Sequence, residues 1–237
     1  MSVLQFWRKR IAIRVLGLTL TVSLCFILFH RWHGSDQSDL ETGRRCGPVA
    51  DSTRTALLDL LSTVHKVLDL LSVQHFLCYD TLWGLLRDGQ LLPWQSEVQL
   101  CAKNGDLQKY DENYLMRQFK LHGLQISYDF QRGVYAVSAL PTVTAPESDS
   151  KAKLRLIVFE WTADTKSYRR VGLQHRILPP TSELLQTFPG WIVEPPLPQG
   201  QLAGLKLPVP REGIELQKYH YKTSWWKELK PPKCLST

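Results

Sequence analysis

The hydrophobic and polar positions of the chain fall into three successive patterns. Residues 11–30 are almost uniformly apolar, whereas residues 31–50 are mostly polar and show no regular period. From residue 52 onward, one segment has apolar residues at helical spacing and several shorter segments alternate as strands do. The order predicts a membrane segment, a short linker and a mixed globular domain.

Residues 11–30 can span a membrane, because at about 1.5 Å per residue they nearly cross a hydrocarbon core of roughly 30 Å. Arg14 lies near one end, where a long side chain reaches the headgroups. The preceding Arg8, Lys9 and Arg10 predict a cytosolic N-terminus. A signal anchor is favoured over a cleaved signal peptide, since no small-x-small cleavage site follows. We expect a cytosolic tail (1–10), a transmembrane anchor (11–30), a lumenal stem (31–50) and a lumenal domain (51–237), in the endoplasmic reticulum or the Golgi.

The globular domain is predicted to be α+β, with one small mixed sheet and flanking helices. Ser52 can cap a helix whose apolar stripe recurs every three or four residues. Residues 178–210 contain most of the prolines and are expected to be irregular. The expected elements are a strand at 75–79, a helix at 81–87, a strand at 97–102, a hairpin of 124–130 with 134–140, and a strand at 154–161.

The net charge of +7 is concentrated at the N-terminus, where five Lys and Arg residues precede the first acid, Asp36. The rest of the chain is nearly balanced and has no Lys/Arg block. A basic stripe is what nucleic-acid binding requires, so nucleic acid is not an expected partner. The membrane is the expected partner of the basic N-terminus.

Five cysteines are present, and Cys25 lies within the predicted membrane segment. In an oxidising lumen, Cys46 and Cys234 are candidates for a disulfide that ties the two ends of the domain together. Cys78 and Cys101 each lie in an apolar, strand-like run. We expect these two to be buried free thiols.

The most informative segment is residues 77–100, LCYDTLWGLLRDGQLLPWQSEVQL. It resembles the signature of the LicD/fukutin family of phosphotransferases, which is approximately G-G-T-L-L-G-A-x-R-x-G-x-x-I-P-W-D-D-D-I-D. A weaker resemblance to the closing G-L-x-V-P-V-P pattern of the family covers residues 204–210. The matching residues are Thr81, Leu82, Gly84, Arg87, Gly89, Pro93 and Trp94 in the first segment, followed after the second by Leu216, Tyr221 and Trp225.

The resemblance implies a nucleotidyltransferase-like fold and transfer of a phospho-group, such as phosphocholine or ribitol phosphate, from a CDP-activated donor to a glycan hydroxyl. Carboxylates two residues apart on a strand point the same way and can hold Mg²⁺ or Mn²⁺ against a pyrophosphate. By this resemblance, Glu97 is the candidate catalytic residue and, with Gln99, the candidate metal ligand. Thr81, Arg87 and Asp80 are the candidate donor-binding residues.

The chain departs from the family pattern at the residues that carry charge. Gln95-Ser96-Glu97-Val98-Gln99 replaces the acidic run, so only Glu97 keeps a carboxylate. Asp80 replaces a glycine beside the expected donor phosphates. A later family aspartate falls at Ile157, and Glu160 points to the opposite face of that strand. Metal affinity is therefore expected to be weak, because a neutral amide supplies none of the charge that concentrates a hard cation.

Other chemistry-bearing side chains give weaker signals. Tyr219, Tyr221, Trp225 and Trp226 can form a sugar-stacking platform, or they can dock the terminal helix onto its own domain. His75, His122 and His175 show no partner at catalytic or metal-ligand spacing.

Three functions remain open. The favoured one is a non-catalytic family member that binds or assists a glycosylation enzyme or a glycan acceptor. The second is an active phosphotransferase with a rearranged site built from Glu97, Asp80 and Asp88. The third is a structural membrane protein without a glycan role.

Overall fold

The computed structural model describes residues 23, 48–140, 152–177, 186–222 and 224–226. All of these except Ser23 belong to a compact unit that spans Arg45–Thr237. No helix among the described residues is long and apolar enough to cross a membrane. The cytosolic tail, the anchor apart from Ser23, most of the stem, and Cys46 and Cys234 lie outside the described residues, so those expectations stay predictions.

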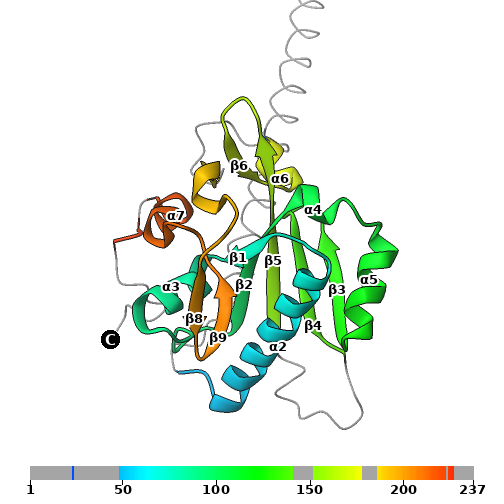
Figure 1. The fold of residues 1–237 in the computed structure, drawn as a ribbon, viewed down its shortest axis with the longest axis vertical. Coiled ribbons are helices and arrows are strands. Elements are labelled where there is room, and N and C mark those ends of the chain that lie inside the picture. Colours follow the sequence, from blue (N-terminus) through cyan, green and yellow to red (C-terminus); the bar gives the residue numbers. More distant parts are fainter. Residues whose placement is uncertain (1–22, 24–47, 141–151, 178–185, 223, 227–237) are drawn as a thin grey trace, which may run out of the picture. The chain divides into compact units, whose positions relative to one another are not determined.

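A seven-stranded mixed sheet forms the centre of the unit (Figure 1). Its main path runs β1-β2-β5-β4-β3, and β6 and β7 extend it from β5. Only the β2–β5 pair is parallel among the described pairings; the others are antiparallel. The strands are β1 (His75–Leu77), β2 (Glu97–Lys103), β3 (Leu124–Asp129), β4 (Val134–Ala139), β5 (Lys153–Thr162), β6 (Ser167–Arg170) and β7 (Thr187–Pro189). The predicted α+β class and mixed sheet are confirmed.

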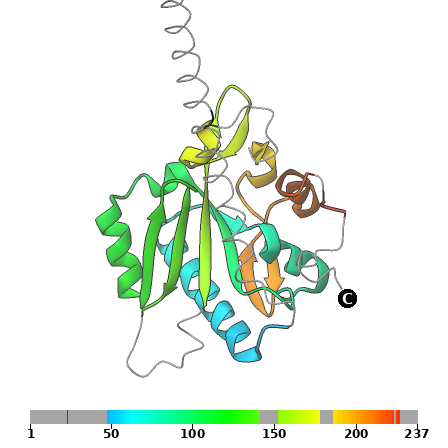
Figure 2. The same ribbon diagram turned by 180° about the vertical axis from the view of Figure 1, so that it is seen from behind.

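The helices flank this sheet, and the first of them, α2, crosses one of its faces (Figures 1 and 2). The strand expected at 75–79 ends at Leu77, and Tyr79, the last residue of the expected range, begins α3. Ser52 does not cap α2, because Ala50 is the N-cap and makes no side-chain capping bond. The helices are α2 (Asp51–Leu70), α3 (Tyr79–Asp88), α4 (Asn104–Leu107), α5 (Glu112–Leu121), α6 (Leu173–Ile177), the 3₁₀ helix η3 (Gly190–Val193) and α7 (Gly213–His220).

The two faces of the sheet differ in polarity, and strand register shows how. One row across β2, β5, β4 and β3 consists of Val98, Leu154, Val137 and Ile126, all buried in the same hydrophobic cluster as the apolar stripe of α2. The next row, on the opposite face, consists of Gln99, Arg155, Ala136 and Ser127. Exposure increases along this second row, from buried Gln99 to exposed Ser127. The candidate site residues of β2 therefore lie on the polar face.

Residues 178–210 were expected to be irregular, and for the described part this is wrong. Besides β7 and η3, it contains the hairpin of β8 (Gln199–Leu202) and β9 (Leu205–Pro208). Ala203 and Gly204 both have positive φ, as a two-residue hairpin turn requires. The prolines on both sides of this turn argued against strands, because proline is rare inside strands, but it is tolerated at their ends.

Cys78 and Cys101 form a disulfide, so the prediction of two free thiols is wrong. Cys101 pairs with Phe76 in the antiparallel β1–β2 ladder, and Cys78 lies two residues beyond Phe76. Both thiols consequently face the same side of the sheet at a diagonal position. The bond joins the residue before α3 to the middle of β2.

Helix α7 packs against the first turn of α3 through aromatic rings. His220 stacks on Tyr79 with 3.9 Å between ring centroids and 6° between the ring planes. The His220 side chain is buried, and neither ring nitrogen has a hydrogen-bond partner among the described residues. Burial, reinforced by Arg170, lowers the pKa of His220 to about 3. His220 is thus a neutral packing group at physiological pH.

Substitution of Gly84 tests the close approach of α3 to the chain that leads into β2. A Cβ at Gly84 would lie 2.3 Å from the backbone oxygen of Gln90. Gly84→Ala should therefore lower the free energy of unfolding by about 1–3 kcal/mol, although Gly→Ala in a helix usually raises it. Chemical denaturation measures this. Gly105→Ala in α4 is the control, since nothing lies within 4 Å of its Cβ, and equal losses in both variants would contradict the account.

The buried His220 should make the fold sensitive to acid. Its pKa rises from about 3 in the folded state towards 6.5 in the unfolded chain, so the unfolded chain binds more protons between these values. This contribution to stability is complete above pH 6.5 and falls by up to about 1.4 kcal/mol per pH unit as the pH decreases towards 3. His220→Phe should remove that part of the slope in denaturation curves measured at several pH values, whereas exposed His122→Gln should keep it. A wild-type slope in His220→Phe would refute the assignment.

Candidate functional site

The candidate site lies where the first turn of α3 meets the start of β2, on the polar face of the sheet. The structure brings Thr81, Gln99 and Gln95 together there, with Glu97 and Arg155 beside them. The loop of residues 89–96 connects α3 to β2 and supplies Gln95. Three of the predicted site residues thus meet in one polar cluster.

Thr81 is fully buried, and its hydroxyl is saturated with hydrogen bonds. The hydroxyl donates to Oε1 of Gln99 (3.2 Å), and it accepts from Nε2 of Gln95 (2.7 Å) and from the backbone N–H of Gln99 (2.8 Å). The Thr81 backbone N–H also donates to Oε1 of Gln99, at 3.3 Å. The network joins α3 to β2 and leaves the Thr81 hydroxyl no proton to donate to a phosphate oxygen.

Gln95 completes this network from the connecting loop. Besides Thr81, its Nε2 donates to the backbone oxygen of Glu97 at 2.9 Å, while its Oε1 accepts from the backbone N–H of Leu92 at 3.3 Å. Gln95 and Gln99 are both buried. Their amides occupy two positions of the motif where the family has carboxylates, and both are engaged within the protein.

Glu97 forms a two-pronged ion pair with Arg155 of β5. Nη2 of Arg155 lies 2.6 Å from Oε1 of Glu97, and Nε of Arg155 donates to Oε2 at 2.9 Å. Both side chains are largely but not fully buried, at 23% exposure for Glu97 and 30% for Arg155. The one carboxylate that remains of the acidic run is therefore already neutralised by a permanent cation.

The turn before Thr81 is filled by side chains. Tyr79, at the first of the two motif glycines, has a φ of 51°, a left-handed conformation that costs a bulky residue of order 1–3 kcal/mol. Its hydroxyl donates to Gln186, and its backbone oxygen accepts from Nε2 of Gln217 at 2.7 Å. Asp80 accepts a hydrogen bond from the Tyr221 hydroxyl at 2.6 Å. Burial raises the pKa of Tyr79, so its phenol stays protonated.

Arg87 and Ile157 do not join the cluster. Arg87 is exposed in the last turn of α3, about 9 Å along the helix axis from Thr81. Ile157 is buried in β5 on the same face as Arg155, so the position of the later family aspartate carries no ligand atom. Glu160 lies on the other face, as its alternation predicts, within 3.7 Å of Arg176.

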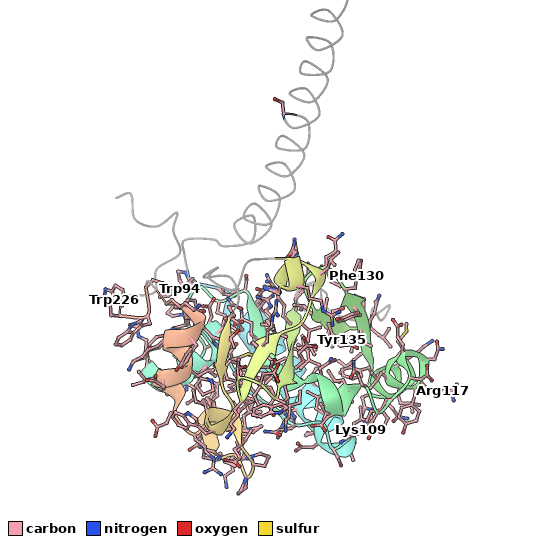
Figure 3. All side chains as sticks on the ribbon, turned by 90° about the horizontal axis from the view of Figure 1, so that it is seen from above. Trp94, Lys109, Arg117, Phe130, Tyr135 and Trp226 are labelled. Carbon is pink, nitrogen blue, oxygen red and sulfur yellow. A yellow bond between two sulfur atoms is a disulfide. The ribbon has the colours of Figure 1, made fainter. Side chains whose placement is uncertain are left out.

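The C-terminal aromatics are divided between the two expected roles. The hydroxyl of Tyr221 holds Asp80, whereas Trp226 is 60% exposed and projects from the surface (Figure 3). Trp225 contacts Trp226 edge to face and lies under Nζ of Lys218, 5.0 Å from it. Docking accounts for Tyr221, and a sugar-stacking role stays a prediction for the two tryptophans.

One cluster escaped the sequence interpretation altogether. His75 was expected to have no partner at metal-ligand spacing, and this is wrong: His65, Asp69 and His75 each offer a ligand atom within 4.8 Å of the others. His65 and Asp69 are four residues apart in α2, a spacing that places them on one face of a helix. That spacing was the available signal, but the position of His75 depends on the turn that follows α2.

Comparison with known proteins identifies the domain. No curated protein matches the chain. Residues 72–212 match the model of the LicD/FKTN/FKRP family, nucleotidyltransferase domain, and so cover more than half of the chain. The match contains α3, β2, β5 and the β8–β9 hairpin, and hence the whole polar cluster around Thr81. The chain belongs to the LicD/FKTN/FKRP family.

Proposed function

We propose that this protein is a non-catalytic member of its family, anchored in the endoplasmic reticulum or Golgi membrane, which acts by binding a glycosylation enzyme or a glycan acceptor in the lumen. The observation that carries the proposal is the internal saturation of the motif. Thr81, Gln95 and Gln99 satisfy one another, and Arg155 neutralises Glu97. No carboxylate of the acidic run is left to hold a metal ion.

Electrostatics opposes a metal ion at Glu97. A divalent ion bound there would lie close to the guanidinium of Arg155, whose positive charge cannot be removed by deprotonation. Two unit charges about 4 Å apart repel by about 4 kcal/mol at an effective dielectric constant of 20, and a divalent ion doubles this. The neutral amide of Gln99 offsets none of it. An ordinary Mg²⁺ or Mn²⁺ site is therefore not supported at this position.

The turn that would approach the donor phosphates also differs from an open phosphate cradle. A glycine-rich turn lets backbone groups approach a phosphate, whereas here the ring of Tyr79 stacks on His220 and Asp80 adds a negative charge. Gln217 of α7 binds the Tyr79 backbone oxygen. The Tyr79 backbone and the Asp80 side chain are thus both engaged by residues of α7 and its C-cap.

The Cys78–Cys101 disulfide supports the lumenal part of the proposal. Disulfides persist in oxidising compartments and are rare in the cytosol. This agrees with the orientation expected from the basic N-terminus. The apolar segment at residues 11–30 would supply the anchor.

The non-catalytic proposal predicts that metal and donor nucleotide do not bind together at the motif. Calorimetric titration of the full-length protein with CDP in the presence of Mn²⁺ should give no metal-dependent heat. The titration is best done in a His65→Ala background, so that the histidine cluster of α2 and β1 does not contribute metal binding.

The matched comparison is Glu97→Gln against Glu112→Gln, since Glu112 is an exposed carboxylate at the start of α5. Mn²⁺-dependent CDP binding that disappears in Glu97→Gln but persists in Glu112→Gln would overturn the proposal and favour an active phosphotransferase.

The lumenal orientation can be tested with one introduced glycosylation site. The chain has no Asn-x-Ser/Thr acceptor, and Ala163→Asn creates one with Asp164 and Thr165 in the exposed turn between β5 and β6. When this variant is expressed in a secretory cell, it should gain one endoglycosidase-sensitive glycan. Ala163→Gln is the control and should stay unmodified. An Ala163→Asn chain without a glycan would contradict lumenal placement.

A further inference from the structure

The second polar cluster of the unit lies at the other end of β2 from Glu97. His65 and Asp69 come from the last two turns of α2, and His75 is the first residue of β1. His75 pairs with Ala102, five residues beyond Glu97 along β2, which corresponds to about 17 Å. His65 and Asp69 also precede the family match, which begins at residue 72. The cluster is therefore separate from the motif of the family.

The geometry of His75 fixes which ring nitrogen faces the cluster. Nδ1 of His75 lies 2.8 Å from the backbone oxygen of Val73. A carbonyl oxygen only accepts, so Nδ1 carries the proton and Nε2 presents its lone pair. A metal-binding histidine is commonly oriented in this way, by a hydrogen bond from its other nitrogen to a backbone carbonyl. The side chain is 2% exposed, so this orientation is held by packing.

The cluster contains more acceptors than donors when both histidines are neutral. Nδ1 of His65 lies 2.7 Å from Nε2 of His75 and can donate to it. Nε2 of His65 then faces Oδ2 of Asp69 at 3.4 Å without a proton between them, and Oδ1 of Asp69 lies 3.9 Å from Nε2 of His75. Nε2 of His75 accepts the hydrogen bond from His65, so the acceptors left without a donor inside the cluster are Nε2 of His65 and the Asp69 carboxylate. A cation would satisfy the surplus acceptors.

A small transition-metal ion would replace the hydrogen bond between His65 and His75, whose nitrogens lie 2.7 Å apart and must separate slightly to bind it. Zn²⁺ binds imidazole nitrogen and carboxylate oxygen at about 2.0–2.2 Å, so tetrahedral ligand atoms lie about 3.4 Å apart. The Asp69 side chain is 61% exposed, so its carboxylate can move towards an ion. The His65 side chain is 19% exposed and therefore has less freedom to move. Two imidazoles and one carboxylate favour a borderline ion such as Zn²⁺ over the hard Mg²⁺ or Mn²⁺.

The cluster opens into a cavity that leaves room for a fourth ligand. The cavity measures about 430 Å³ and is lined by all three residues, by Gln74, and by Leu197 and Lys206 from the segments around β8 and β9. Lys206 would favour an anionic fourth ligand over a second cation. A site with three protein ligands and an open position differs from a closed structural zinc site.

We propose that His65, Asp69 and His75 form a binding site for one Zn²⁺ ion, with its fourth coordination position open to the cavity.

Zinc titration of the metal-stripped, full-length protein tests this. The protein should be prepared without a histidine tag. One equivalent of Zn²⁺ should bind and raise the melting temperature, because the ion binds the folded state in preference. His65→Ala and Asp69→Ala should each weaken binding by at least about tenfold, a loss that even outer ligands of a metal site can cause. Mg²⁺ should not compete.

Two control variants separate this site from other sources of zinc binding. His122→Ala removes an exposed histidine elsewhere, and Glu97→Gln alters the family motif; both should bind Zn²⁺ as the wild type does. X-ray absorption of the zinc-loaded protein should show nitrogen and oxygen ligands with an imidazole signature. Absence of stoichiometric binding, a sulfur-dominated ligand shell, or equal losses in the control variants would overturn the proposal.

Discussion

The domain is organised around the buried hydroxyl of Thr81. It is the point where the first turn of α3 is fixed to β2, because it exchanges hydrogen bonds with both the side chain and the backbone of Gln99. The neighbouring residues are tied down as well: Cys78 by its disulfide to β2, the backbone oxygen of Tyr79 by Gln217, and the carboxylate of Asp80 by Tyr221. Four consecutive residues are thus held from two sides, two by β2 and two by α7 and its C-cap residue. This explains how a tyrosine with a left-handed backbone is tolerated at Tyr79.

The replacement of carboxylates by amides changes what the fold needs in order to be stable. Carboxylates at residues 95, 97 and 99 would repel one another and would each be costly to bury unless a cation joined them. Gln95 and Gln99 remove that repulsion, and their amides both donate and accept, so the network closes on itself. Arg155 then provides the positive charge that balances the carboxylate of Glu97. Within the described residues, the polar groups of the motif therefore satisfy one another without a further charge.

Sequence patterns predicted the fold where a segment has a clear hydrophobic period. The strands at 97–102, 124–130, 134–140 and 154–161 and the long helix after residue 50 are confirmed within a few residues, because period-2 and period-3.6 patterns report one buried face directly. The β8–β9 hairpin was missed, since its turn residues lie among prolines. The disulfide was missed because it depends on the register between β1 and β2, which a single sequence does not contain.

The same limit applies to the site. The motif assigned Thr81, Glu97 and Gln99 to one site, but it could not show that Gln95 and Arg155 occupy their hydrogen-bonding capacity. Nor could it show that His75 meets His65 after a turn in which Ser72 adopts a positive φ. The two ends of β2 consequently differ in a way that charge counting along the sequence does not reveal. At the Glu97 end every motif ligand has a protein partner, whereas at the His75 end the three residues line an open cavity and their acceptors outnumber their donors. Because a ligand is drawn to acceptors that the protein leaves unsatisfied, the proposed cation site is better placed at the second end than at the first.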